Sequence, residues 1–397
     1  IEMLTNQSFS SRSLIDSKGK MSIYRGRAGT GKTVRLIQTA IKLVDEEQMR
    51  VLILTYNRSL VSDIRRLFAL AELPDMFEEN CVSVNTMQSF FFHLANNLLY
   101  DGRMLGDEFL EKYDSVLREM NVFLSDDDAI CLAKESMAAD ETLDWDYVLI
   151  DEAQDWKAGE RDVILKLFEK GKTIIADGGN QFVRRGQMCD WATVRDRNNI
   201  KLKYCLRQKE NIVSFLNEYS RNVDMPGEKI LSNGKMPGGK IIIISDDMVF
   251  DTHKREMDSL IKCGNIAYDM LYFVPHSLVK RSNGESQFAL IREFERHNVF
   301  FWDGTNSSNR GNYSTASDEV RVFQYDSARG LEGWTVVCMD FDVFLEEKVA
   351  EYIEGEVDSL LLESPEEKKR KYIYNWAMIP FTRAIDTLVI TIKDKES

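Results

Sequence analysis

Residues 22–36 read SIYRGRAGTGKTVRL, and this stretch decides the fold of the N-terminal part of the chain. A short apolar run enters a glycine-rich loop, and a Lys-Thr pair then opens a helical pattern. The loop matches G-x-x-x-x-G-K-[ST], whose backbone N–H groups and following helix N-terminus form a nest for anions. We therefore predict a nucleotide site in which Lys32 reaches the β- and γ-phosphates and Thr33 binds Mg²⁺. The loop residues expected to contact the nucleotide are Gly26, Arg27, Ala28, Gly29, Thr30, Gly31, Lys32 and Thr33.

A second apolar run, DYVLIDEAQDW at 146–156, ends in two acids. Because ligands of open α/β sheets bind at the carboxyl ends of the strands, Asp151 and Glu152 are expected at the same edge as the loop. Asp151 is the candidate to hold Mg²⁺, and Glu152 is the candidate to position and deprotonate an attacking water. Together with the phosphate-binding loop, the two acids predict ATP hydrolysis.

Further apolar runs alternate with helical patterns of ten or more residues along the whole chain. These runs cover 51–57, 172–177, 240–244, 270–274, 336–342 and 387–392. Near-continuous apolar strands separated by helices are typical of parallel sheets covered on both faces. The sequence therefore predicts an α/β protein with two doubly wound lobes. Residues 1–205 are expected to form the first lobe, with a small, mostly helical insertion at about 95–145, and residues 206–397 the second.

The composition of the 397 residues excludes some classes of function. Hydrophobic residues make up 44% and charged residues 29%, and no apolar run approaches the roughly 18 residues of a membrane span. The six cysteines are far apart and form no CxxC pair, which argues against disulfides and zinc and favours the cytoplasm. The net charge of −14 argues against a broad basic surface for duplex DNA but leaves room for a narrow basic groove.

The chain resembles a known family in its motifs. DEAQD (151–155), together with GRAGTGKT (26–33), resembles the UvrD/Rep-like branch of the superfamily 1 helicases. Further segments are similar to the family's motifs and follow in the same order. They are ILTYNRSL (53–60), VNTMQSFFFHL (84–94), ADGGNQF (176–182), LRQKENIVSFLN (206–217), YDSARGLEGWTVV (325–337) and IPFTRAIDTLVI (379–390).

The resemblance implies that ATP binds between two RecA-like lobes and that hydrolysis opens and closes them. It implies catalytic roles for Lys32 and Glu152, a γ-phosphate sensor at Gln181, and phosphate-contacting arginines at Arg207 and Arg383. Further expected nucleotide contacts are Gly330, Glu332 and an adenine-reading Gln7. The expected nucleic-acid contacts are Tyr56, Arg58, Arg184 and Arg185.

Several positions depart from the family pattern. Gly178 stands where the family has an acid, and Arg184 and Arg185 occupy a region that normally carries base-stacking aromatics. Leu206 replaces an adenine-stacking Tyr, and Asp326 replaces a His, where an acid would repel a nearby phosphate. The loop at about 305–319 stands where related enzymes insert a large accessory subdomain. The motifs expected to catalyse ATP hydrolysis match the family pattern, whereas those expected to contact nucleic acid depart from it.

The leading prediction is an Mg²⁺- and ATP-dependent helicase or translocase on single-stranded nucleic acid, with DNA preferred over RNA and no membrane role. The first alternative is an ATPase switch or scaffold that signals to a protein partner, or to a fused domain beyond Ile1, without unwinding a duplex. The second alternative is an RNA-directed helicase.

Overall fold

The computed structural model describes two compact α/β units. The described residues are 19–56, 58–70, 73, 76, 81–178, 189–225, 229–282, 285–306, 308, 309, 312, 314, 316–352 and 364–393. Of these, 19–26 and 31–202 form the first unit, whereas 27–30 and 203–393 form the second. Each unit is built around one six-stranded sheet.

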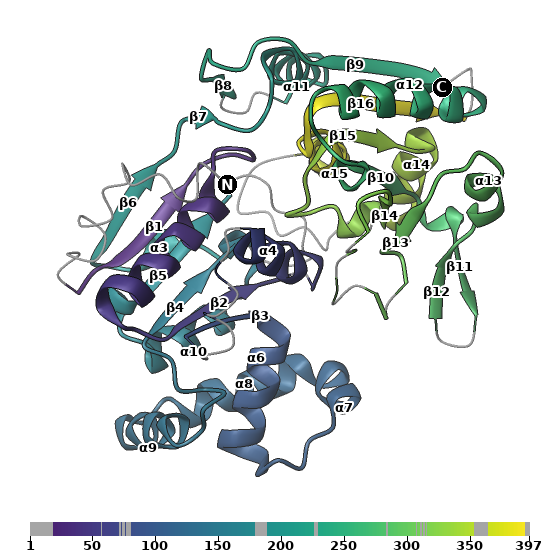
Figure 1. Cartoon of the computed structure of the whole chain (residues 1–397). Helices are drawn as coiled ribbons and strands as arrows, with labels where there is room; N and C mark the ends of the chain where they lie inside the picture. Colours follow the sequence, from purple (N-terminus) through teal and green to yellow (C-terminus); the bar gives the residue numbers. More distant parts are fainter. Residues whose placement is uncertain are drawn as a thin grey trace. The chain divides into compact units, whose positions relative to one another are not determined.

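The sheet of the first unit is parallel throughout, as the apolar runs predict. Its strands, in spatial order, are β3 (Val82–Thr86), β2 (Val51–Thr55), β4 (Tyr147–Ile150), β5 (Thr173–Asp177), β1 (Met21–Arg25) and β6 (Arg197–Lys201). Strand β5 lies between β4 and β1, so the carboxyl ends of these three strands are neighbours at one edge of the sheet (Figure 1).

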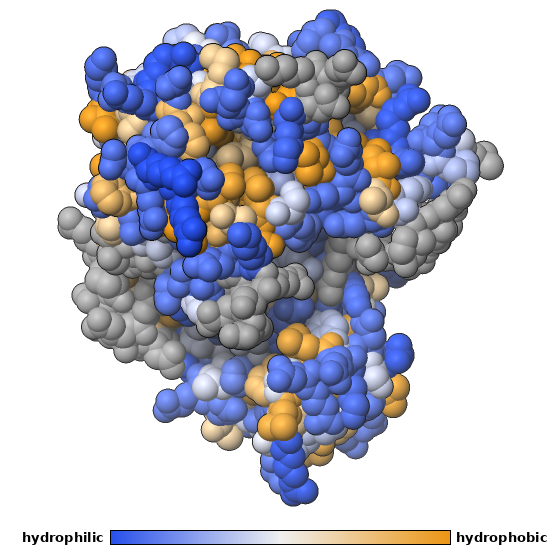
Figure 2. Space-filling view, turned by 90° about the vertical axis from the view of Figure 1, so that its right-hand side faces the viewer, coloured by the Kyte–Doolittle hydropathy of each residue, from blue (hydrophilic) through white to orange (hydrophobic). Residues whose placement is uncertain are grey.

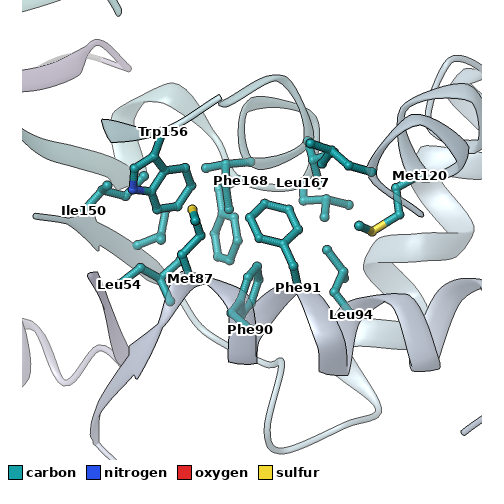
Figure 3. Packing of buried hydrophobic residues seen from close by; sticks show 14 of the residues in the cluster. Leu54, Met87, Phe90, Phe91, Leu94, Met120, Ile150, Trp156, Leu167 and Phe168 are labelled. Atoms are coloured by element: carbon teal, nitrogen blue, oxygen red, sulfur yellow. The ribbon is translucent and has the colours of Figure 1, made fainter. Parts of the chain in front are cut away.

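Each face of this sheet carries its own hydrophobic core, because alternate strand residues point to opposite faces. Val51 and Ile53 pack with the apolar stripes of α3 (Lys32–Glu47) and α4 (Arg58–Leu70). Leu52 and Leu54 pack on the opposite face with α6 (Met87–Ala95), α8 (Tyr113–Phe123) and α10 (Ala158–Leu167). Phe91 meets the Trp156 ring edge-on in this second core, with Phe168 beside it (Figure 3).

The segment between α6 and β4 is helical. It contains the single π-helical turn η1 (Asn96–Tyr100), α7 (Gly106–Glu111), α8 and α9 (Asp127–Ala138) (Figure 1). The Asp126 carboxylate caps α9 by accepting a hydrogen bond from the Ala129 N–H over 3.2 Å. Apolar residues of α8 and α9 join the core under the sheet, so the insertion belongs to the first unit's packing.

The sheet of the second unit is also parallel throughout. Its strands, in spatial order, are β13 (Phe301–Asp303), β14 (Val320–Gln324), β10 (Met270–Val274), β15 (Gly333–Cys338), β16 (Ala384–Ile392) and β9 (Lys240–Ser245). Its helices are α11 (Glu210–Asn222), α12 (Val249–Lys262), α13 (Ile291–Arg296), α14 (Phe341–Glu351) and α15 (Pro365–Phe381). Two small ladders accompany the sheet, β7 (Tyr204–Cys205) with β8 (Leu231–Ser232), and β11 (Val279–Ser282) with β12 (Glu285–Phe288).

The second unit buries apolar residues on both faces of its sheet. One core joins α12 and α13 to β10 through residues such as Leu260, Phe294 and Tyr272. A second cluster is aromatic: the Tyr325 ring stacks on Phe344 of α14 with centroids 3.9 Å apart. Single 3₁₀ turns of this unit lie at η5 (Asp246–Met248), η6 (Ala267–Asp269), η7 (His276–Leu278) and η8 (Tyr325–Ser327), and those of the first unit include η3 (Lys170–Lys172) and η4 (Trp191–Thr193).

The fold class predicted from the sequence is confirmed, since each unit is a parallel α/β sheet with helices on its faces. Figure 2 shows hydrophilic residues spread over one face of the molecule, with apolar residues scattered between them. Within the described part of the chain, no helix combines the length and the apolar character that a bilayer crossing requires.

Candidate active site

The glycine-rich loop follows β1 and leads directly into α3. Gly29 and Gly31 have φ of +75° and +83°, a left-handed backbone that side chains other than glycine's rarely adopt. Gly31 is the N-cap of α3, which has no side-chain cap and no acid in its first turn. The N-terminal N–H groups of this 16-residue helix therefore face no protein carboxylate of their own helix, and the local backbone suits an anion.

Lys32 closes the loop on itself. Its side chain is buried, and Nζ donates a hydrogen bond to the carbonyl oxygen of Gly26 over 2.9 Å. Thr30 Oγ1 donates to the Arg27 carbonyl oxygen over 2.8 Å and ties the middle of the loop. An ammonium held at the mouth of an anion nest adds a positive charge where phosphate oxygens would lie.

Thr33 and Asp151 are in direct contact, although 118 positions separate them in the sequence. Thr33 Oγ1 donates to Asp151 Oδ2 over 2.6 Å, and Asp151 Oδ1 accepts from the Glu152 N–H over 2.9 Å. Burial, and next the charge of Glu152, raise the pKa of Asp151 to about 6. The Thr33 hydroxyl and the buried Asp151 carboxylate thus place two oxygen atoms side by side. Such a pair fits Mg²⁺, which prefers hard oxygen ligands.

Glu152 has an unusual backbone. Its φ of +49° places a non-glycine residue in the left-handed region at the point where β4 ends and the 3₁₀ turn η2 (Ala153–Asp155) begins. Such conformations cost about 1–3 kcal/mol and persist only where the surrounding structure holds them in place. Here the turn directs the Glu152 carboxylate toward Gln154, whose Nε2 donates to Glu152 Oε2 over 2.5 Å.

Three separate segments of the second unit bring the other nucleotide candidates together. Arg207 Nε forms an ion pair with Glu332 Oε2 at 2.8 Å, and its Nη1 lies 3.5 Å from the Thr382 carbonyl oxygen. Arg383 is 4% exposed, and its guanidinium donates to the Ile379 carbonyl oxygen and to Thr382 Oγ1, each over 3.0 Å. Gly330, with φ of +78°, precedes Glu332 in the turn before β15.

Residues 27–30 of the loop also belong to the second unit's contacts. The Leu206 N–H donates to the Gly29 carbonyl oxygen over 2.8 Å. A Cβ on Gly29 would lie 2.8 Å from Cys205 Sγ, so this position needs glycine for space as well as for φ. The segment around Arg207 therefore has a backbone attachment to residues 27–30, which belong to the same unit.

Only two of the four candidate nucleic-acid contacts, Tyr56 and Arg58, are among the residues that the structure describes. Tyr56 follows β2, is half-buried and packs against the first unit's core, whereas Arg58 is exposed at the start of α4. The candidates Gln7, Gln181, Arg184 and Arg185 lie outside the described residues. Their roles stay predictions.

Two contacts involve residues that the sequence did not single out as site residues. One is Gln154, the fourth residue of DEAQD; a polar residue three positions after Asp151 was the available signal. The other surrounds Asp326, which contacts His276 Nε2 at 2.7 Å and Lys348 Nζ at 2.6 Å. The sequence predicts that Asp326 repels phosphate; in the structure its carboxylate is paired with these two basic side chains, and Lys348 Nζ also pairs with Glu351 Oε2 at 2.8 Å.

The described residues hold no group of three or more His, Cys, Asp or Glu side chains that suits a metal ion. The candidate Mg²⁺ position therefore depends on the Thr33–Asp151 pair and on oxygens that a nucleotide would supply.

Comparison with known proteins gives distant structural likenesses. No family model and no curated protein sequence matches the chain. The structure of PRRSV helicase aligns with 96% of this chain at 12% identity and a TM-score of 0.40. A complex of Arterivirus nonstructural protein 10 (helicase) with DNA aligns with 96% of the chain at 10% identity and a TM-score of 0.36. The alignments cover 54% and 63% of those chains, so this chain spans little more than half of their length. This chain is similar to helicase structures, and the likeness concerns the fold alone.

Proposed function

We propose that this chain is an ATP-hydrolysing motor of the UvrD/Rep-like superfamily 1 type, acting as a helicase or translocase on single-stranded DNA. The observation that carries the proposal is the 2.6 Å contact between Thr33 of the glycine-rich loop and Asp151 at the end of β4. It joins a phosphate nest, an Mg²⁺ donor pair and a carboxylate base at one sheet edge. These are recurring parts of sites that catalyse phosphoryl transfer.

Each residue of the first unit has a distinct part in this proposal. The loop backbone and Lys32 bind the β- and γ-phosphates, and Thr33 and Asp151 hold the metal. Mg²⁺, when bound, would neutralise charge on the phosphate oxygens. Glu152 positions a water and accepts its proton, and its left-handed backbone at the end of β4 fixes the direction of the carboxylate.

We propose that the second unit contributes Arg207 and Arg383 to the same nucleotide. An arginine that reaches the transferred phosphoryl group from another part of the protein is worth roughly 10³–10⁵ in rate. Support comes from the convergence of Arg207, Glu332 and Thr382 within the second unit. Gln181 is proposed as the sensor of the γ-phosphate, and Gly330 and Gln7 as further nucleotide contacts.

The distribution of charge supports a nucleic-acid partner in spite of the net charge of −14. The helical insertion at 95–145 holds 13 acidic and 4 basic residues, which makes −9 of that total. The other parts of the chain together carry only −5. We propose that the strand avoids the insertion and contacts Tyr56, Arg58, Arg184 and Arg185 instead.

ATP turnover measured with and without single-stranded DNA and RNA tests the proposal. A motor on DNA gives turnover that oligo-dT stimulates strongly, and RNA of equal length stimulates weakly. Stronger stimulation by RNA would assign the chain to RNA-directed helicases. Absence of turnover under all three conditions would refute an ATPase.

A second candidate function is an ATPase switch that signals to a protein. The insertion favours it, because Leu105, Val122 and Leu132 are 72%, 72% and 63% exposed among many acids. Exposed large apolar side chains mark protein contacts where they lie together in one patch, which is what this candidate function requires of these three. The same assay separates the two functions, since a switch hydrolyses ATP at a rate that neither polymer changes.

A further inference from the structure

The end of β4 and the end of β5 are joined by one buried side chain. Gln154 is 2% exposed and makes a hydrogen bond at each end of its amide. Its Nε2 donates to Glu152 Oε2 over 2.5 Å, and its Oε1 accepts from the Gly178 N–H over 2.7 Å. The two bonds fix which end of the amide is nitrogen, because a carboxylate only accepts and a backbone N–H only donates.

The turn that carries Gln154 is held firmly. The carbonyl oxygen of Ala153 accepts a hydrogen bond from Trp191 Nε1 over 2.8 Å, and Trp191 packs edge-on against Trp156. Both indole rings are buried in the core below the sheet. The Gln154 side chain therefore starts from a rigid backbone, and its amide has little freedom to leave Glu152.

Gly178 is shaped for this amide. A Cβ built on Gly178 would lie 2.8 Å from Gln154 Nε2 and 3.1 Å from its Cδ. The backbone of Gly178 does not adopt the left-handed φ that would itself require glycine. A side chain here would thus crowd the Gln154 amide, at the position where the resembling family carries an acid.

From these contacts we propose that Gln154 is a positioning residue for ATP hydrolysis, which holds the Glu152 carboxylate in the direction of the attacking water. This inference rests on the proposed function. Through Gly178, the same amide fixes the end of β5, three residues before Gln181 in the sequence. Gln154 touches neither nucleotide nor water in this role, and acts through Glu152.

The test compares four variants in steady-state ATP hydrolysis. Q154A removes the amide, Q154M keeps the volume without the hydrogen bonds, and G178A places a methyl group where the amide lies. The double variant Q154A/G178A combines the loss of the amide with the added methyl group. Displacement of a catalytic group by about 1 Å costs on the order of 10² in rate. We expect kcat to fall by about that factor in all four, with KM and the affinity for a fluorescent ATP analogue within about twofold of wild type.

Matched controls come from a similar pair in the same unit. Asn121 Nδ2 donates to the Gly159 carbonyl oxygen over 3.1 Å, and a Cβ on Gly159 would lie 3.2 Å from that nitrogen. N121A and G159A therefore disturb an amide facing a glycine that has no part in the proposed site. They should lower Tm as much as Q154A and G178A do, with kcat unchanged.

Three results overturn the inference, and they are distinguishable. Wild-type kcat in Q154M, with E152Q inactive, would show that Gln154 only fills space while the proposed function stands. Equal loss of kcat in N121A and in Q154A would show a general effect of instability. If the wild-type protein itself does not hydrolyse ATP, the proposed function fails and the inference fails with it. Loss of kcat in Q154A without further loss in Q154A/G178A supports one shared role.

Discussion

Thr33 Oγ1 donates a hydrogen bond to Asp151 Oδ2 over 2.6 Å, and this contact joins the first turn of α3 to the end of β4. β5 separates β4 from β1 in the sheet, so the contact spans two strand spacings at the carboxyl edge. The loop after β1 must fold back toward β4 for the hydroxyl to reach. The two glycines with positive φ allow this path, and the result is one oxygen-rich corner beside Lys32.

K32A and E152Q should both abolish turnover, for different reasons. Lys32 is expected to bind phosphate, so K32A should weaken the binding of ATP by at least tenfold. Glu152 is expected to act in chemistry, so E152Q should bind ATP normally and fail to hydrolyse it, because an amide does not accept the proton of water. Binding of a fluorescent ATP analogue and phosphate release measure the two effects separately. Wild-type turnover in E152Q would refute the catalytic assignment.

R207A should lower turnover by about 10³ and leave stability nearly unchanged. The guanidinium of Arg207 is partly exposed, and such ion pairs are worth about 0–1 kcal/mol. The rate effect follows from the loss of charge at the transferred phosphoryl group. R50A is the matched control, because Arg50 also forms a 2.8 Å ion pair, with Asp144 in the first unit. Equal kcat values in R207A and R50A would contradict the assignment.

R383A should differ from R207A in stability. Arg383 is 4% exposed and hydrogen-bonded to Ile379 and Thr382. Removing it breaks two buried hydrogen bonds, each worth about 0.5–1.5 kcal/mol, while Thr382 Oγ1 still donates to the Ile379 carbonyl oxygen over 2.9 Å. Urea unfolding and turnover should be measured on the same preparation, and both should fall. A loss of stability with normal specific activity would make Arg383 a purely structural residue.

The His276–Asp326 pair should make the second unit more stable below neutral pH than above it. The hydrogen bond to Asp326 raises the pKa of His276, in opposition to burial. Burial acts to raise the pKa of Asp326, but the hydrogen bonds from His276 and Lys348 outweigh it and lower that pKa. Protonated His276 thus stabilises the fold fully below its unfolded pKa of about 6.5, and this contribution is lost as pH rises through the raised folded value. Asp326 contributes above about pH 4, and its contribution is lost as pH falls through its lowered folded value.

Urea midpoints at pH 5.5 and pH 8.5 measure this contribution. The difference between the two midpoints should shrink in H276Q relative to wild type. H93Q, a substitution in the first unit, is the control and should leave the difference unchanged. An identical pH dependence in H276Q and wild type would show that the pair adds nothing to stability.

The strands that the sequence predicts best are the buried central ones. The run at 270–274 coincides with β10, and β5 begins within one residue of its predicted start. The edge strands β3, β6 and β13 were not predicted, because an edge strand is half-solvated and loses the continuous apolar signal. The buried strand β14 was not predicted either, because Arg321 and Gln324 interrupt its apolar run. β9 is an edge strand too, but it could be predicted because it contains four consecutive isoleucines.

The candidate site shows a similar division. Motif positions such as Lys32, Thr33 and Asp151 could be predicted because their chemistry requires those residue types at that spacing. Gln154 could not, because its role depends on the space left by Gly178, 24 residues later. A contact between the ends of two strands leaves no local pattern in the sequence.

The last prediction concerns the nucleic-acid contacts, of which Arg184 and Arg185 lie outside the described residues. R184E/R185E should abolish single-strand binding and leave basal ATP turnover intact. Binding that rests on charge releases counterions, so the affinity should fall with salt at a log–log slope of about −0.7 per phosphate neutralised. Fluorescence anisotropy with labelled oligo-dT measures the slope for both proteins. A salt range of about 50 to 200 mM is wide enough, since the affinity of a protein with several phosphate contacts falls by about 10³ or more across it. R103E/R118E, in the acidic insertion, reverses the same number of charges and should bind as wild type does. Equal affinity of R184E/R185E and wild type for oligo-dT would show that these arginines do not contact the nucleic-acid strand. If the wild type binds no nucleic acid with an ATP analogue present, the ATPase switch that signals to a protein would be favoured.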